Sequence, residues 1–159
     1  MNDVIRFEYI GVSPFEIETI YNILSKFARV DEKELADELE YVSLLNIDFP
    51  VPYDEYFFQL LGFDNWKKIK DLFKEMKRRR GRKGLKIILS FSGVPTDTNS
   101  RLMFSLSNDI GPQFEYAVEK IEHMMDSIHI QIRNLETKRK VASYSYDAIA
   151  MKWVLSDRV

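Results

Sequence analysis

A long apolar stripe near the C-terminus constrains the fold of this chain more than any other feature. Between Gly111 and Leu135, apolar residues recur at alternating spacings of four and three residues, at Phe114, Val118, Ile121, Met125, Ile128 and Ile132. This spacing places them on one side of an α-helix. The other side carries charged residues suited to water. The pattern therefore predicts a long amphipathic helix over 111–135, the main helix of the protein.

This stripe supports two interpretations. In the first, the helix packs against a sheet of its own chain. In the second, the 114–135 stripe pairs with a second copy, and the protein is a homo-oligomeric scaffold or dimer. The interface residues would then be Phe114, Val118, Ile121, Met125, Ile128 and Ile132. The stripe covers only about three heptads, near the minimum for a coiled coil, so self-association is the secondary hypothesis.

Other periodic segments predict the remaining elements. Alternation of apolar and polar residues predicts strands at 5–9, 85–91, 102–106 and 142–146. The middle two, joined by a polar loop, predict a hairpin over 85–107. Helical spacing of apolar residues predicts helices over 13–29, 31–47, 54–61 and 64–80. Ser13 and Glu16 form a capping-box pattern at the start of the first helix, and Gly62 predicts the end of the helix at 54–61. The segment 148–155 fits either a strand or a helix, and its alanine content favours a helix.

Together these elements predict an α+β fold. We expect a small mixed, mostly antiparallel sheet packed against several helices, including the long C-terminal amphipathic helix. Its 45% hydrophobic content is sufficient for a buried core. We expect a single domain over 1–159. If it divides at all, the Arg/Gly segment at 78–84 would join a helical part, 1–80, to a β-hairpin and long helix, 85–159.

Several functional classes are disfavoured by residues that are missing or badly spaced. The chain has no cysteine, which excludes disulfides and thiolate metal sites. His123 and His129 are six residues apart, too far around a helix to share one metal ion. No phosphate-binding loop or dinucleotide motif occurs. We therefore expect no metal and no cofactor. No apolar run could span a membrane, and we expect a cytoplasmic protein without membrane contact.

A basic segment over 64–86 carries the clearest functional signal. It holds 11 of the chain's 23 Lys and Arg residues, whereas residues 1–57 carry an acidic excess. Such a surface attracts phosphate backbones or acidic proteins. We therefore expect a non-enzymatic binding or assembly protein that contacts an acidic partner, nucleic acid or protein. The candidate contacts are Lys67, Lys70, Lys74, Lys77, Arg78, Arg79, Arg80, Arg82 and Lys83.

Other interpretations stay open. The basic segment can balance the acidic N-terminal part within the chain, and an enzyme site can escape recognition in one sequence. The segments around 93–112, with Arg101 nearby, could bind a small anion at a helix start. The order of three helices, a hairpin and a long helix is similar to that of winged-helix proteins. That resemblance implies a basic helix in the DNA major groove.

Overall fold

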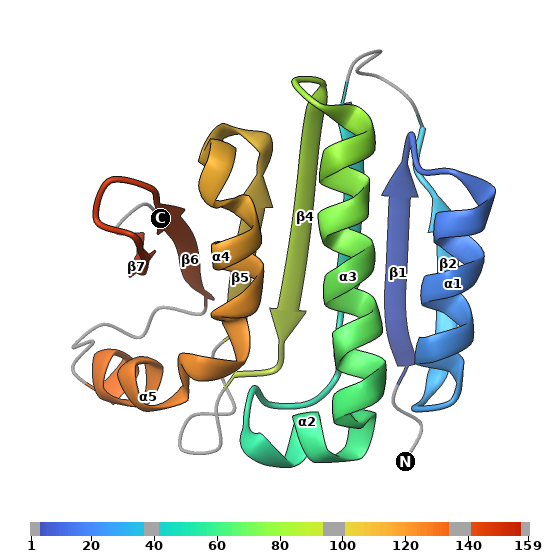
Figure 1. The fold of residues 1–159 in the computed structure, drawn as a ribbon. Coiled ribbons are helices and arrows are strands. Elements are labelled where there is room, and N and C mark those ends of the chain that lie inside the picture. The colour runs from blue at the N-terminus through green and yellow to red at the C-terminus, as the bar shows by residue number, and fades with distance from the viewer. Residues whose placement is uncertain (1–3, 37–41, 94–100, 134–140, 157–159) are drawn as a thin grey trace.

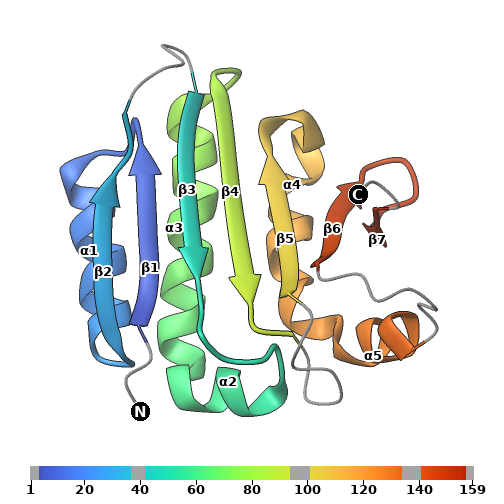
Figure 2. The same ribbon diagram turned by 180° about the vertical axis from the view of Figure 1, so that it is seen from behind.

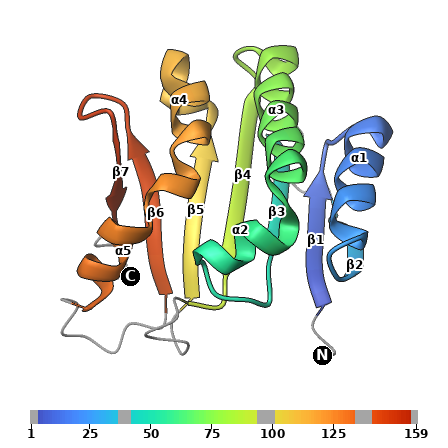
Figure 3. The same ribbon diagram turned by 60° about the horizontal axis from the view of Figure 1, so that its bottom comes forward.

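In the computed structural model, which describes residues 4–36, 42–93, 101–133 and 141–156, the chain forms one seven-stranded sheet. The strands are β1 (Val4–Ile10), β2 (Arg29–Glu34), β3 (Val42–Asp48), β4 (Gly84–Phe91), β5 (Arg101–Ser107), β6 (Val141–Asp147) and β7 (Lys152–Leu155). The helices are α1 (Pro14–Ser25), α2 (Glu55–Leu61), α3 (Phe63–Arg80), α4 (Phe114–Glu119) and α5 (Met125–Arg133). Helices α1, α3 and α4 lie on one face of the sheet (Figures 1 and 3).

The sheet is mixed, in the order β2-β1-β3-β4-β5-β6-β7. The pairs β1–β2, β3–β4 and β5–β6 are parallel, and the other three are antiparallel. The prediction of a mostly antiparallel sheet is therefore wrong. Each parallel pair is joined by a connection that contains at least one helix, as parallel neighbours require.

The predicted helix over 31–47 is also wrong, because this stretch contributes to two strands. Strand β2 pairs in parallel with β1, and the hydroxyl of Tyr9 donates a hydrogen bond to Glu32 at 2.5 Å. Strand β2 has a free edge and consists almost entirely of charged residues, which discourages pairing with other chains. The acidic residues of this stretch are therefore exposed on a strand, and not on the outer side of a helix. Without a second helix, the element order of a winged-helix protein is also lost.

The long helix predicted over 111–135 is not formed as one piece. A 3₁₀ segment (Asn108–Gln113) precedes α4, and a second short one (Ile121–His123) separates α4 from α5. The first is broken at Gly111, where φ is +69°, a conformation that glycine adopts without strain. The break between α4 and α5 contains neither proline nor glycine, so its cause lies elsewhere in the fold.

That cause is a buried tyrosine. The hydroxyl of Tyr53 donates to the carbonyl of Ile121 and accepts from the backbone N–H of Met124 at 3.3 Å. A side chain inserted in this way replaces the regular helical hydrogen bonds and bends the helix. Burial raises the pKa of Tyr53, so the hydroxyl keeps the proton that it donates. From Phe114 to Ile128, the residues of the apolar stripe still face the core, as their spacing predicted, even though the helix is broken.

Other predicted elements agree with the structure more closely. The first strand, the α1 capping box at Ser13 and Glu16, and helix α3 are confirmed. Strands β4 and β5 form the predicted antiparallel pair. For 148–155 the favoured helix is wrong, and the strand alternative is confirmed over its second half: Asp147 accepts backbone hydrogen bonds from Ile149 and Ala150, which forms a turn that leads into β7.

An aromatic core lies between the sheet and the helices. At its centre Phe104 is fully buried, with ring centroids 5.3 Å from Tyr53 and Trp153 and 5.9 Å from Tyr144. The indole N–H of Trp153 donates to the carbonyl of Ala117 at 3.0 Å. These contacts join α4 and the loop before α2 to the C-terminal strands, so the core is continuous across the sheet.

This packing predicts the effect of removing one ring. We expect Phe104→Ala to lower the free energy of unfolding by about 3–5 kcal/mol, because it leaves a cavity among rings that cannot close around it. Urea denaturation followed by tryptophan fluorescence measures the change. The control Tyr116→Ala, at an exposed position, should change stability by less than about 0.5 kcal/mol. Equal losses in both variants would contradict this account of the core.

Candidate functional site

Helix α3 holds most of the predicted binding residues and lies between α1 and α4 over the middle of the sheet (Figure 1). Its buried residues include Trp66, Ile69, Phe73 and Met76. With 18 residues it is about 27 Å long. Because one side of α3 is in the core, its cations point toward the neighbouring helices or into water.

Two of these lysines lie between α3 and α4. The ammonium of Lys70 is 2.8 Å from both Glu119 and Glu122, and Lys74 forms an ion pair with Glu119. The indole N–H of Trp66 donates to Glu122. Burial alone would lower the pKa of Lys70, but its hydrogen bonds to Glu119 and Glu122 outweigh burial and raise it. These cations therefore hold two antiparallel helices together and are not available to a partner.

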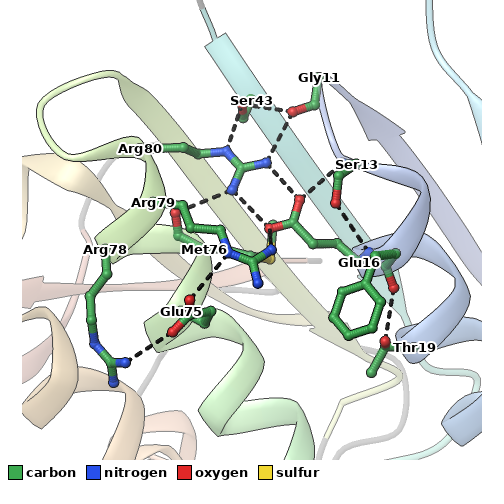
Figure 4. A network of polar contacts seen from close by, with 11 residues as sticks. Gly11, Ser13, Glu16, Thr19, Ser43, Glu75, Met76, Arg78, Arg79 and Arg80 are labelled. Atoms are coloured by element: carbon green, nitrogen blue, oxygen red, sulfur yellow. Dashed lines mark hydrogen bonds and ion pairs between the residues drawn. The ribbon is translucent and has the colours of Figure 1, made fainter.

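On the other side, α3 is tied to α1 by a buried ion pair (Figure 4). The guanidinium of Arg80 forms two hydrogen bonds with the carboxylate of Glu16, at 2.8 and 3.0 Å. It also donates to the hydroxyl of Ser43 and the carbonyl of Gly11. Glu16 is only 1% exposed. Arg80 therefore connects α1, α3 and β3, and it is a structural residue.

Arg78 and Arg79 are exposed and have surface partners. Arg78 pairs with Glu75 at 3.0 Å and with Glu115 at 3.1 Å. Arg79 pairs with Glu75 at 3.2 Å and also lies 3.7 Å from the buried carboxylate of Glu16. Exposed pairs such as those with Glu75 contribute little to stability, about 0–1 kcal/mol each. Arg78, whose partners are all exposed, can exchange them for another anion.

Most of the remaining cations of the segment gather at one end; Lys68, exposed in the first half of α3, also has no ion-pair partner among the described residues. Lys77, Arg82, Lys83 and Lys86, here called the basic end, have no carboxylate within ion-pair distance among the residues that the structure describes. They lie at the C-terminus of α3, in the following turn and at the start of β4. The ammonium of Lys77 instead donates to the carbonyl of Gly81 at 2.9 Å. Lys67, by contrast, pairs with Asp71 at 3.3 Å.

A cleft of about 360 Å³ lies near the opposite end of α3, here called the acidic cleft. It is lined by Glu55, Phe58, Phe63, Glu122, His123, Met125 and Asp126. Glu122 is already paired with Lys70. Within the described parts of the chain, Glu55 and Asp126 have no ion-pair partner. The cleft thus combines aromatic and thioether surface with two carboxylates that are free to bind cations.

The sheet face away from the helices is not covered by any described element (Figure 2). Its central feature is an ion pair of 2.8 Å between Arg101 and Asp48, across strand β4. The anion site expected around 93–112 is not assembled as predicted. Gly93 and Asn108 follow opposite ends of the β4–β5 pair, and residues 94–100 lie outside the described residues.

The predicted oligomerisation residues mostly lie inside the chain. Phe114, Val118, Ile121 and Ile128 are at most 1% exposed, and Met125 packs against the core from a partly buried position. The side chain of Ile132 lies outside the described residues. These four buried side chains could contact a second copy only if the chain opened.

Comparison with known proteins leaves the function to be argued from this geometry. No protein-family model matches the sequence, and no curated protein or solved structure matches it at significant similarity. In the described ranges, no three His, Asp or Glu side chains are grouped so as to hold a metal ion. No helix among those residues has the length and apolar character needed to span a membrane.

Sequence reasoning missed the carboxylates that neutralise α3. Glu115, Glu119 and Glu122 recur at helical spacings of four and three residues, and Lys70, Lys74 and Arg78, with which they pair, recur at spacings of four. Both series are present in the sequence, but nothing in it says that they face each other. Glu16 gives no such signal because its capping role accounts for it locally. The acidic cleft was missed as well, since its residues come from segments about 60 positions apart.

The buried pair gives a stability prediction. We expect Arg80→Met to lower the free energy of unfolding by about 3–5 kcal/mol, because it removes the bidentate partner of the buried Glu16 carboxylate and leaves only the N–H of Ser13 and the more distant Arg79 beside it. Urea denaturation provides the measurement. Arg78→Met, which breaks only exposed pairs, is the control and should change stability by about 0–1 kcal/mol. A mild effect of Arg80→Met would show that water reaches Glu16.

The same network predicts how stability depends on pH. Burial alone would raise the pKa of Glu16, but the hydrogen bond from Arg80 and those from Ser13 lower it below the ordinary 4.5. A carboxyl with a lowered pKa stabilises the fold above its unfolded pKa, and this is lost as pH falls through the folded value. We expect the free energy of unfolding to decrease below about pH 4.5, less steeply in a Glu16→Gln/Arg80→Met variant. If the free energy of unfolding fell equally steeply with decreasing pH in parent and variant, Glu16 would not have this role.

Proposed function

We propose that this protein is a non-enzymatic binding or assembly protein whose basic end contacts an acidic segment of a protein partner. The observation that carries the proposal is the separation of the cations into two groups. Lys70, Lys74 and Arg80 are held by carboxylates of their own chain, whereas the basic end is exposed and has no such partner among the described residues.

The surroundings of the basic end favour a protein over a nucleic acid. Single-stranded nucleic acids need exposed aromatic rings on which bases stack. The aromatic residues of the described strands are all buried, at Phe7, Tyr9, Phe91, Phe104, Tyr144, Tyr146 and Trp153. Phe15 in α1 is exposed beside Arg79, and one such ring can anchor a protein segment, whereas a single-stranded nucleic acid stacks its successive bases on several rings.

The geometry also changes which variants can test the proposal. A variant that reverses the charge of Arg80 would remove the partner of the buried Glu16, so its effect would reflect folding and not binding. Arg82 and Lys83 are exposed, and no ion pair of the described chain depends on either. The variant Arg82→Glu/Lys83→Glu, called the reversed end, therefore changes the surface charge while leaving the fold intact.

We expect a fluorescently labelled oligoglutamate peptide to bind the parent protein, with an affinity that falls as salt is added. Fluorescence anisotropy at low protein concentration measures this binding. The reversed end should weaken it by at least about tenfold. The control Lys26→Glu/Lys152→Glu makes the same change in net charge at two other exposed lysines and should bind nearly as well as the parent.

Two results would overturn the proposal. One is the absence of peptide binding even at low salt. The other is binding that the reversed end and the control weaken equally, since that would reflect net charge and not the basic end. Oligonucleotides of about the same charge are measured in parallel. If they bind more tightly than the peptide, and only through Arg82 and Lys83, the partner is a nucleic acid.

A further inference from the structure

The two ends of α3 carry complementary surfaces. The basic end lies at and just after its C-terminus, and the acidic cleft includes Phe63, its first residue, so the helix length of about 27 Å separates them. We propose that the acidic cleft of a second copy of this chain is a partner of the basic end, so that copies associate head to tail. This inference rests on the proposed function, because it identifies the acidic partner for the same basic end.

The basic end has an apolar group beside it. Phe15, in the first turn of α1, is 63% exposed, and the guanidinium of Arg79 lies 5.9 Å from its ring centroid. The buried Arg80–Glu16 pair holds this turn next to the C-terminus of α3. An exposed aromatic ring next to cations is the type of side chain that anchors protein interfaces. This end therefore presents both charge and a hydrophobic anchor.

The acidic cleft is suited to receive those groups. Met125 is partly buried and offers apolar surface, Phe63 at the rim is 70% exposed, and Phe58 closes the floor of the cleft from the core. A cation that enters beside Phe63 would meet the face of an aromatic ring and the carboxylates of Glu55 and Asp126 together. At about 360 Å³ the cleft is near the lower limit for ligand pockets, so it suits a few side chains of a neighbouring molecule.

The two surfaces differ, so their contact is heterologous and does not close at two copies. Mass should therefore increase beyond that of a dimer as concentration rises, in contrast to a two-fold pair. The net charge of only −2 adds little general repulsion between copies. Exposed ion pairs contribute weakly and are screened by salt, so association is expected at high protein concentration and low salt.

The test is a charge-swap experiment read by sedimentation velocity. The reversed end, Arg82→Glu/Lys83→Glu, is combined with a reversed cleft, Glu55→Lys/Asp126→Lys. We expect each variant alone to remain at the monomer mass of 18.8 kDa under conditions in which the parent associates. An equimolar mixture of the two should associate again, because the acidic cleft of one meets the basic end of the other. Circular dichroism checks that both variants are folded.

A second variant tests the apolar anchor independently of charge. Phe15→Ser should weaken self-association by about tenfold, the equivalent of about 1.4 kcal/mol. Ile149→Ser, at an exposed apolar position in the turn before β7, is the control and should associate like the parent.

The outcomes separate this inference from the proposed function. If the parent stays monomeric at high concentration and low salt, or if the mixture of reversed variants does not associate, the head-to-tail contact is wrong. The proposed function still holds in that case if the reversed end loses oligoglutamate binding. If association proceeds in both reversed variants, another surface is responsible and the inference is overturned. Association that stops at a dimer also contradicts it.

Discussion

The packing of α3 against the middle of the sheet is the constraint on which the rest of this structure depends. Its apolar side is buried among aromatic rings, so the charged residues on its flanks lie close to α1 and α4. Charges brought that close and partly buried need partners. Glu16 and Arg80 on one flank, and Lys70 with Glu122 on the other, meet this requirement. The helical layer is thus held by burial in the centre and by ion pairs on both sides.

This arrangement determines where charge remains for binding. A cation that is hydrogen-bonded to a carboxylate of its own chain offers little to a partner. The flanks of α3 are therefore largely neutral, and the unpaired charge collects at its two ends. The basic end and the acidic cleft are consequences of the same packing. The proposed binding of an acidic partner follows from the unpaired cations of the basic end. The proposed self-association follows from the unpaired carboxylates of the acidic cleft.

Local signals predicted much of the fold, and elements that depend on distant partners were missed. The capping box at Ser13 and the stop at Gly62 set the bounds of α1 and α2 because they act within a few residues. By contrast, β2 is a strand because of its pairing with β1, although its charges resemble those of a helix surface. The break between α4 and α5 depends on Tyr53, about 70 residues away. No local pattern contains that information.

For the candidate site, the sequence alone determined that cations concentrate in 64–86 and that acidic residues dominate 1–57, because charge is a property of the residues themselves. Only the tertiary structure decided which of those cations are neutralised. Arg80 and Arg82 are the same residue type two positions apart. Arg80 is paired with the buried Glu16, whereas Arg82 has no carboxylate partner in the described chain. The physical reason is that a charge is strengthened or cancelled by what lies within a few ångströms, and helix packing and strand order set those distances.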